Sequence, residues 1–159
     1  LLKVPGPDVY QRVTGLMDRI KEAERTIAQL NQEKVLARAN DAAASAQKLG
    51  PATVVTTELG EVANAADVRS FVLDVRNRLD DPAHVIAAVG LANDKPAVVI
   101  AVGPDAQQAG LKAGALVTSA CKTLGGGGGG KPDLAQGGGQ DATQVTQALH
   151  NVRDQVAKS

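Results

Sequence analysis

The sequence predicts an α+β protein in which a long N-terminal helical, coiled-coil-like arm precedes a small globular α/β domain built on a mixed sheet. Apolar residues recur in steps of three and four along the first part of the chain. After Gly50-Pro51 the pattern changes to short β-branched runs that alternate with helical periods. The composition, 43% hydrophobic and 21% charged over 159 residues, is that of a folded chain. We therefore expect a helical arm over residues 1–50 and a globular domain over residues 51–159.

The arm is predicted from its apolar seam. Val4-Pro5-Gly6-Pro7 is typical of a turn, and Asp8 is a candidate N-cap for the helix that follows. The seam residues are Val13, Leu16, Ile20, Ala23, Ile27 and Leu30. Lys34 interrupts this seam, and a second one begins out of phase at Val35 and continues to Leu49. The phase slip predicts a local change in winding or a bend between two helices.

A single helix of this length cannot bury such a stripe against itself. Packing on the globular domain, on a second helix, or on a second copy of the chain would each bury it. The sustained heptads favour self-association. The residues expected at a dimer contact are Val13, Leu16, Ile20, Ile27 and Leu30.

The globular domain begins with a predicted strand over residues 53–57, whose residues are mostly β-branched. Asn64 is positioned to cap a helix that ends before Asp80. Residues 85–91 and 97–102 are apolar runs joined by a short polar segment, which predicts a hairpin. Because both runs are almost entirely apolar, we expect them in the centre of a covered sheet.

Two further helices are predicted, one over residues 113–124 and one that starts near Asp141. Cys121 falls on the apolar face of the first, which favours an inert core thiol over a nucleophile. His84 opens a predicted strand and His150 lies beside an apolar stripe. Neither histidine has a carboxylate or cysteine at useful spacing, so we interpret both as structural.

The composition excludes several classes of function. The formal net charge is zero, which argues against indiscriminate polyanion binding. Aromatic residues make up 1% of the chain, so a base-stacking platform is absent. One cysteine and two histidines disfavour a zinc site, and the single cysteine suggests a reducing, cytoplasmic setting. No apolar stretch approaches the roughly 20 residues of a membrane span. The start at Leu1-Leu2-Lys3, without Met, suggests a piece of a longer protein.

The most unusual feature is a glycine-rich segment over residues 125–139, which we expect to be a loop. It holds nine of the seventeen glycines in the chain. Ordering glycine costs roughly 0.5–1 kcal/mol per residue relative to alanine, so such a segment needs a reason. A flexible linker, a phosphate cradle, or close approach of another backbone would each supply one. The linker is disfavoured because the segment joins two helices of one small domain.

A nucleotide cradle is also disfavoured. Gly125, Gly130 and Lys131 match the first seven positions of a Walker A loop, but Pro132 stands where a metal-binding Ser or Thr is required. The segment follows a helix instead of a strand, which disfavours both a P-loop and a dinucleotide site. The remaining interpretation is a surface of bare main chain that approaches a sugar-phosphate chain or a base pair.

Cations flank this segment. The stretch from Ala106 to Pro132 contains Lys112, Lys122 and Lys131 and no acid. Three solvated surface lysines are one interpretation. The other is that Lys122, before the segment, and Lys131, after the glycine run, position RNA through its phosphates without reading its sequence.

The run from Thr123 to Gly139, TLGGGGGGKPDLAQGGG, resembles the signature near the C-terminus of alanyl-tRNA synthetases. In that family a glycine run is followed by a cation, Pro, Asp, an apolar residue, Ala-Gln and further glycines. The family's C-terminal region is a helical part followed by a DHH-associated globular domain. The resemblance therefore covers the chain, most firmly from Gly114 to Val156 and only in architecture along the arm.

The resemblance implies that the globular domain binds the elbow of alanine-specific tRNA and that the arm supports a homodimer. The implied tRNA-binding residues are Lys122, Gly125, Gly126, Gly127, Gly128, Gly129, Gly130, Lys131, Gln136, Gly137, Gly138 and Gly139. Such a module assists aminoacylation and editing by the remainder of the synthetase chain. It is not itself an enzyme and uses no cofactor or metal, whereas the parent, an alanine–tRNA ligase, uses ATP, magnesium and zinc.

The sequence departs from the family pattern at two points. All six positions of the run are glycine where many relatives carry a lysine, and Lys131 stands where arginine is frequent. Because lysine binds phosphate only as a point charge, we expect modest affinity. A purely structural oligomerisation domain and the accessory domain of a DHH-type phosphoesterase are the alternatives. The second is weak, because no histidine lies between Gly125 and Gly139.

Overall fold

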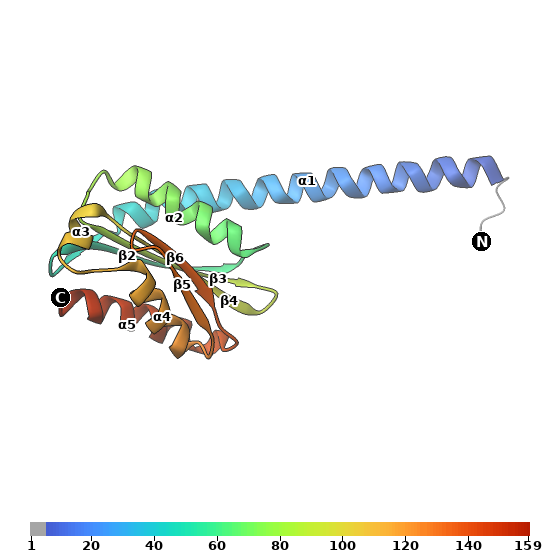
Figure 1. The fold of residues 1–159 in the computed structure, drawn as a ribbon. Coiled ribbons are helices and arrows are strands. Elements are labelled where there is room, and N and C mark those ends of the chain that lie inside the picture. Colours follow the sequence, from blue (N-terminus) through green and yellow to red (C-terminus); the bar gives the residue numbers. More distant parts are fainter. Residues whose placement is uncertain (1–5) are drawn as a thin grey trace. The chain divides into compact units, whose positions relative to one another are not determined.

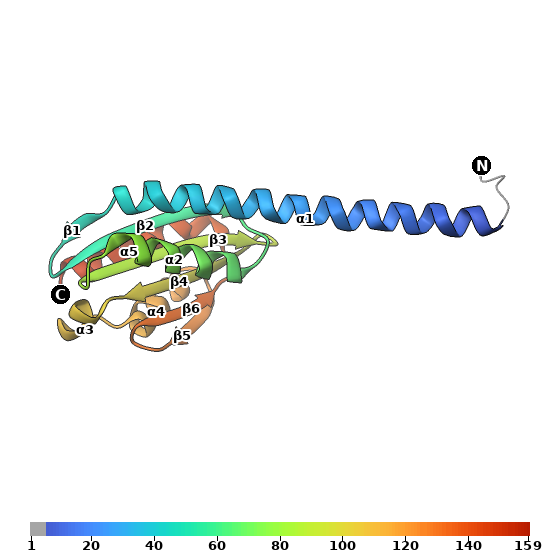
Figure 2. The same cartoon turned by 90° about the horizontal axis from the view of Figure 1, so that it is seen from above.

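A computed structural model describes residues 6–159 of the protein. Its globular part is a single six-stranded sheet with helices on both faces (Figures 1 and 2). The predicted α+β class, with a long helix ahead of a mixed sheet, is confirmed. Along the sheet the strand order is β1-β2-β3-β4-β6-β5. The strands are β1 (Gln47–Leu49), β2 (Ala52–Glu61), β3 (His84–Ala92), β4 (Lys95–Val102), β5 (Gly127–Gly130) and β6 (Leu134–Gly138).

The helices connect and cover these strands. They are α1 (Gly6–Ala44), α2 (Ala65–Leu79), α3 (Pro104–Gln108), α4 (Ala113–Thr123), the 3₁₀ helix η1 (Ala142–Gln144) and α5 (Val145–Ala157). Helix α2 is the crossover between β2 and β3, which pair in parallel; every other strand pair is antiparallel. The predicted hairpin of β3 and β4 is confirmed. It turns at Asn93 and Asp94, which both have positive φ, as a tight type I′ turn requires.

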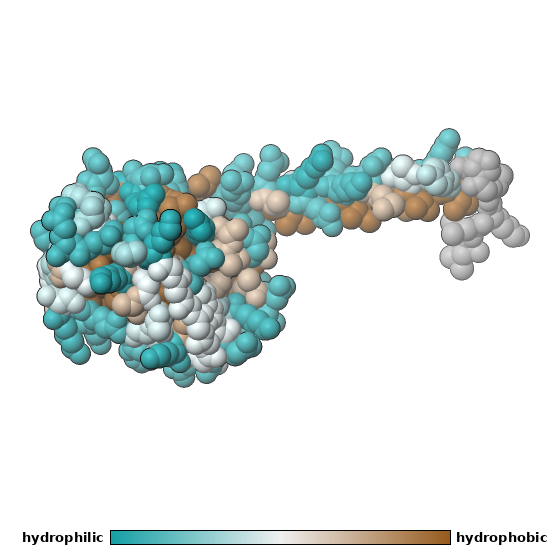
Figure 3. Space-filling model, in the orientation of Figure 1, coloured by the Kyte–Doolittle hydropathy of each residue, from teal (hydrophilic) through white to brown (hydrophobic). Residues whose placement is uncertain are grey.

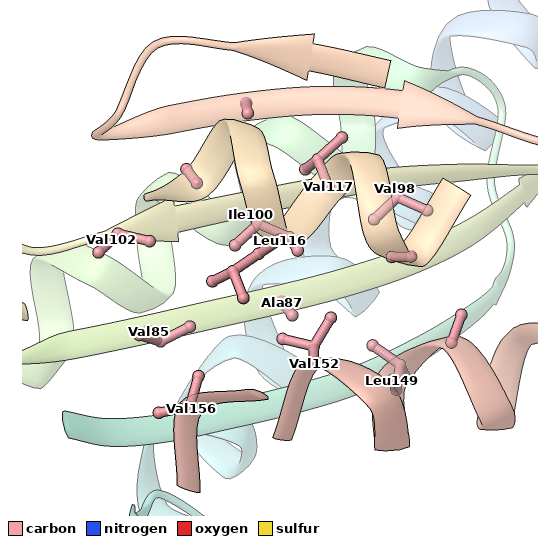
Figure 4. Close-up of a cluster of buried hydrophobic side chains, with 14 of the residues drawn as sticks. Val85, Ala87, Val98, Ile100, Val102, Leu116, Val117, Leu149, Val152 and Val156 are labelled. Atoms are coloured by element: carbon pink, nitrogen blue, oxygen red, sulfur yellow. The ribbon is translucent and has the colours of Figure 1, made fainter. Parts of the chain in front are cut away.

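Two aliphatic cores lie on the two faces of the sheet. One face is covered by α4 and α5, whose Leu116, Val117, Leu149 and Val152 pack on alternate residues of β3 and β4 such as Ile100 (Figure 4). The opposite face is covered by α2 and the last turns of α1. β3 and β4 are buried on both faces, which explains why their sequences are almost entirely apolar.

Helix α2 begins as its sequence predicted. The Asn64 side chain accepts hydrogen bonds from the backbone N–H groups of Ala66 and Asp67. The Asp67 carboxylate in turn accepts from the Asn64 N–H, which completes a capping box. At the other end Asp80 adopts a left-handed conformation with φ of 43° and ends the helix.

Helix α1 differs from its prediction in three ways. It is a single helix across Lys34, so the predicted alternative of two separate helices is wrong. It ends at Ala44, and Leu49, predicted on the second apolar seam, lies in β1 instead. Asp8 is inside the first turn of the helix and is not its N-cap. Of the turn predicted over Val4-Pro5-Gly6-Pro7, Gly6 and Pro7 are helical, while residues 1–5 lie outside the described residues.

The chain forms two compact units, Leu1–Lys34 and Val35–Ser159. The boundary falls where the seam changes phase. The second seam belongs to the larger unit, where Ala39 and Ala42 are buried against β2 and α2. Small side chains let this part of α1 approach the sheet closely. The phase slip therefore marks the point along α1 where the residues that pack in the larger unit begin.

The turn between α2 and β3 contains a carboxylate with a perturbed pKa. Asp81 accepts a hydrogen bond from the Thr53 hydroxyl at 2.6 Å and another from the Ala83 N–H at 2.8 Å. These two bonds, with that from Thr53 the larger cause, hold the pKa of Asp81 below its ordinary value. Since the folded-state pKa is lower than the unfolded one, Asp81 stabilises the fold above its unfolded pKa. That contribution is lost as the pH falls through its folded pKa.

We expect Thr53→Val to lower the free energy of unfolding by about 1 kcal/mol at pH 7, because Asp81 loses a charge-assisted hydrogen bond at a partly exposed site. The difference from the native chain should shrink as the pH falls below the unfolded-state pKa of Asp81 and through its lower folded-state pKa, because the carboxyl is then protonated in both proteins. Urea unfolding across a series of pH values, from pH 7 downward, measures this. Thr57→Val is a matched control on the same strand. A deficit for Thr53→Val that stays constant with pH would contradict the assignment.

No helix among the described residues is long and apolar enough to cross a membrane.

Candidate nucleic-acid interface

The glycine-rich segment is not the loop that was predicted. Gly127–Gly130 form β5, which pairs antiparallel with β6 over four residue pairs, from Gly127↔Gly138 to Gly130↔Ala135. β6 in turn pairs with β4, so the segment is a hairpin that extends the sheet. β5 is the last strand in the order, and its outer edge carries backbone groups that no strand in the described chain pairs. In the orientation of Figure 1 the hairpin lies at the front, and Figure 3 shows a pale band of intermediate hydropathy there.

Most of these glycines are required by packing against α4 and β6. A Cβ on Gly128 would lie 2.6 Å from Val117 Cγ1 and 2.7 Å from the Gly137 Cα. A Cβ on Gly137 would lie 2.6 Å from Cys121 Sγ. Gly126, Gly130, Gly138 and Gly139 would each bring a Cβ within 3 Å of backbone atoms. Gly125 has φ of 68°, a conformation that favours glycine.

Two glycines have no such reason. A Cβ added to Gly127 or to Gly129 would meet nothing within 4 Å, and neither residue has a positive φ. Both are exposed. Because strand residues alternate between faces, these two point away from α4, on the face where Gln136 pairs with Gly129. The fold therefore explains seven of the nine glycines and leaves Gly127 and Gly129 as bare main chain open to solvent.

A ridge of α4 runs along the outer edge of β5. A Cβ on Gly114 would lie 3.1 Å from the Gly130 carbonyl oxygen. One turn further on, the Thr118 hydroxyl oxygen lies 2.8 Å from the Gly114 carbonyl oxygen and 3.2 Å from that of Gly128. Lys122 is the next residue on this ridge, at i+4 from Thr118, and it is exposed. The Gly126 N–H donates to the Cys121 carbonyl, so Lys122 lies at the Gly126 end of β5.

Lys131 lies at the opposite end of β5. It follows Gly130 directly and is exposed. Its N–H donates to the Leu134 carbonyl at 3.0 Å and closes the turn of the hairpin. Among residues 6–159 a single ion pair is present, between Arg78 and Asp74. Neither Lys122 nor Lys131 therefore has a carboxylate oxygen within 4.0 Å of its ammonium group there. The two predicted cations thus stand at the two ends of the glycine strand.

Cys121 lies beneath the hairpin. It is fully buried, and burial raises the pKa of its thiol, which is the state expected for a core residue and not for a nucleophile. His84 is buried, with Nδ1 in contact with the Asp81 carbonyl oxygen, and His150 is exposed on α5. Within the described residues, no three His, Cys, Asp or Glu side chains are grouped so as to hold a metal ion.

The apolar seam residues of the arm are exposed to solvent in the single chain. Val13, Leu16, Ile20, Ile27 and Leu30 each have 48% to 58% of their surface exposed. Apolar atoms gather along one side of the arm in Figure 3. The heptad spacing thus produces a continuous apolar stripe on the unit that ends at Lys34.

Comparison with known proteins agrees with this architecture. The DHHA1 domain family matches residues 51–158. Alanine–tRNA ligases of Thermobifida fusca and Kocuria rhizophila are each 46% identical to this chain over 159 and 157 residues. These matches cover 99% and 98% of this chain but only 18% of each relative, so the chain spans about a fifth of their length.

Solved structures give the same picture. The C-Ala domain of Aquifex aeolicus alanyl-tRNA synthetase superposes with a TM-score of 0.63 at 25% identity, covering 71% of this chain and 98% of that one. A DHH-domain protein described as a member of the S1p family of ribosomal proteins has a TM-score of 0.53 at 15% identity, which shows a shared fold alone. The chain therefore belongs to the DHHA1 domain family, and it resembles the C-terminal region of alanyl-tRNA synthetases.

Proposed function

We propose that this chain is a non-catalytic accessory module of an alanyl-tRNA synthetase, which binds the elbow of tRNA along β5 and associates with a second copy through its arm. The observation that supports RNA binding most directly is the pair of open glycines, Gly127 and Gly129. The packing of the domain does not require glycine at these two positions, and glycine weakens a strand. A partner that closely approaches the backbone is therefore the remaining physical reason for having glycine there.

The chemistry of the edge fits folded RNA. Because Gly127 and Gly129 carry no side chains, a sugar or a base can come into contact with the strand itself, and the flat ribbon around Gly129 and Gln136 can lie against a base pair or a shallow minor groove. Lys122 and Lys131 supply positive charge at the two ends of the strand. Because the chain has zero net charge, this attraction is local and does not extend to polyanions in general.

The parent enzyme's chemistry is assigned to the rest of its chain. In this proposal the ligase and editing sites, with their ATP, magnesium and zinc, belong to other parts of the synthetase. The present chain holds alanine-specific tRNA so that both sites act on the same molecule, in the cytoplasm. The similarity of the whole chain to alanine–tRNA ligases supports this assignment.

We expect the double variant Lys122→Ala/Lys131→Ala to bind tRNA more weakly and with less dependence on salt. The slope of log K against log[salt] should fall by about 0.9 for each phosphate that the variant no longer neutralises. Fluorescence anisotropy with a labelled tRNA of alanine identity measures both quantities across a salt series. An elbow-disrupted tRNA should bind the native chain as weakly as the intact tRNA binds the variant.

The control is Lys48→Ala. Lys48 is also exposed, but it lies on β1 at the opposite edge of the sheet. If the double variant binds as the native chain and Lys48→Ala do, the β5 edge is not the RNA surface. The structural alternative would then hold, in which the glycines serve internal packing alone.

A further inference from the structure

A third lysine lies at the Gly130 end of β5. The backbone N–H of Ala113, the first residue of α4, donates to the Pro132 carbonyl at 2.9 Å. This bond ties the start of α4 to the turn of the glycine hairpin. Lys112 directly precedes Ala113, and Lys131 directly precedes Pro132. The bond therefore brings together two lysines that are far apart in the sequence.

Neither ammonium group is used by the fold. Lys112 occupies the N-cap position of α4, but its side chain makes no capping hydrogen bond. Both lysines are exposed, and neither pairs with a carboxylate within 4.0 Å among residues 6–159. Asp133 is close in sequence to Lys131 but forms no ion pair with it. Exposed lysine side chains on backbone segments this close can both reach one anion, and that anion would offset the repulsion between their charges.

The other end of the strand is separate. Lys122 is ten residues after Lys112, which at a rise of 1.5 Å per residue places their backbones about 15 Å apart along α4. Lys112 and Lys131 thus form one positive end of the edge, and Lys122 forms the other. This spacing favours contacts with different phosphates.

We propose that Lys112 and Lys131 together hold one phosphate of the bound tRNA, while Lys122 contacts another. This inference rests on the proposed function. It has a distinctive consequence, because the salt slope counts phosphates neutralised and not lysines present. Removing one lysine of the pair leaves its partner on the phosphate, whereas removing both releases it.

The experiment is a double-mutant cycle on the full chain, with Lys112→Ala, Lys131→Ala and the two combined. Each single variant should lose a few-fold in affinity for the tRNA and keep most of the native slope. The combined variant should lose about 0.9 in slope, the value for one phosphate. Lys122→Ala should lose a similar amount alone. Lys112→Arg, which keeps the charge, should retain native binding, and circular dichroism checks that each variant folds.

Three results would contradict the inference in distinguishable ways. In the first, Lys112→Ala changes tRNA affinity no more than Lys48→Ala does, and adding it to Lys131→Ala has no further effect. If Lys122→Ala and Lys131→Ala still weaken binding, Lys112 has no role and the proposed function stands. If the combined variant loses about 1.8 in slope, the two lysines hold separate phosphates. If no variant changes the binding of tRNA, or the native chain binds none, the proposed function fails together with the inference.

Discussion

Gly128→Val should unfold much of the globular domain or destabilise it by about 3 kcal/mol, whereas Gly127→Val should leave its stability unchanged or slightly raised. The two positions are neighbours in one strand of identical residues. At Gly128 a Cβ would lie 2.6 Å from Val117 Cγ1, 2.7 Å from the Gly137 Cα and 3.0 Å from Cys121 Sγ. The Gly137 Cα is backbone, so relief would require the hairpin to move off α4.

At Gly127 a Cβ would meet nothing within 4 Å. Valine is favoured over glycine in strands by up to about 1 kcal/mol, so the fold has no reason to resist it. The same substitution should weaken tRNA binding at least tenfold, because a branched side chain holds the RNA away from the strand. Gly129→Val should behave in the same way.

Urea unfolding and tRNA anisotropy on the three variants separate packing from binding. Loss of stability at Gly128 with none at Gly127 tests the packing of the hairpin on α4. Loss of tRNA affinity at Gly127 and Gly129, in proteins as stable as the native chain, tests the interface. Native affinity in both of these variants would show that the open face of β5 does not touch RNA.

The hairpin could not be predicted from the sequence, while the rest of the sheet largely could. β3, β4, α2 and α4 carry apolar periods that specify them locally, and α2 also has a capping box at Asn64. β5 has neither β-propensity nor alternation, since it is four glycines. It is a strand because β6 pairs with it and because α4 can approach it only in the absence of side chains. That reason is tertiary and leaves no periodic pattern in the sequence.

Only part of the candidate site could be predicted, because the rest of it also depends on tertiary contacts. Lys122 and Lys131 stood out because they flank the glycines in a segment without acids. The sequence does not single out Lys112 as a binding residue, because its place near Lys131 depends on the hydrogen bond between Ala113 and Pro132. The division between packed and open glycines also depended on knowing which face of β5 meets α4. Nothing in a run of identical residues distinguishes Gly127 from Gly128.

The arm yields the second large effect: Ile20→Asp/Ile27→Asp should abolish self-association of the chain. Both isoleucines are more than half exposed in the single chain, on the stripe of the first seam. Burying such side chains between two copies yields roughly 1.5–3 kcal/mol each, and every substitution acts twice in a symmetric dimer. Placing a carboxylate there removes this contribution and adds the cost of desolvating a charge. Sedimentation velocity at micromolar concentration should show the native chain as a dimer and the variant as a monomer.

Gln11→Asp/Gln29→Asp is the matched control. At 100° per residue these two glutamines lie on the side of α1 opposite the seam, so the same added charge should leave a dimer intact. Equal masses for the native chain and the Ile20/Ile27 variant would remove those residues from any contact between copies. The phase slip at Lys34 separates the two seams in this test. Ala39 and Ala42, which are buried in the globular unit, belong to the second seam, and neither substituted isoleucine does. The first seam has no such partner among the described residues of its own unit, which is why we expect a second copy of the chain to cover it.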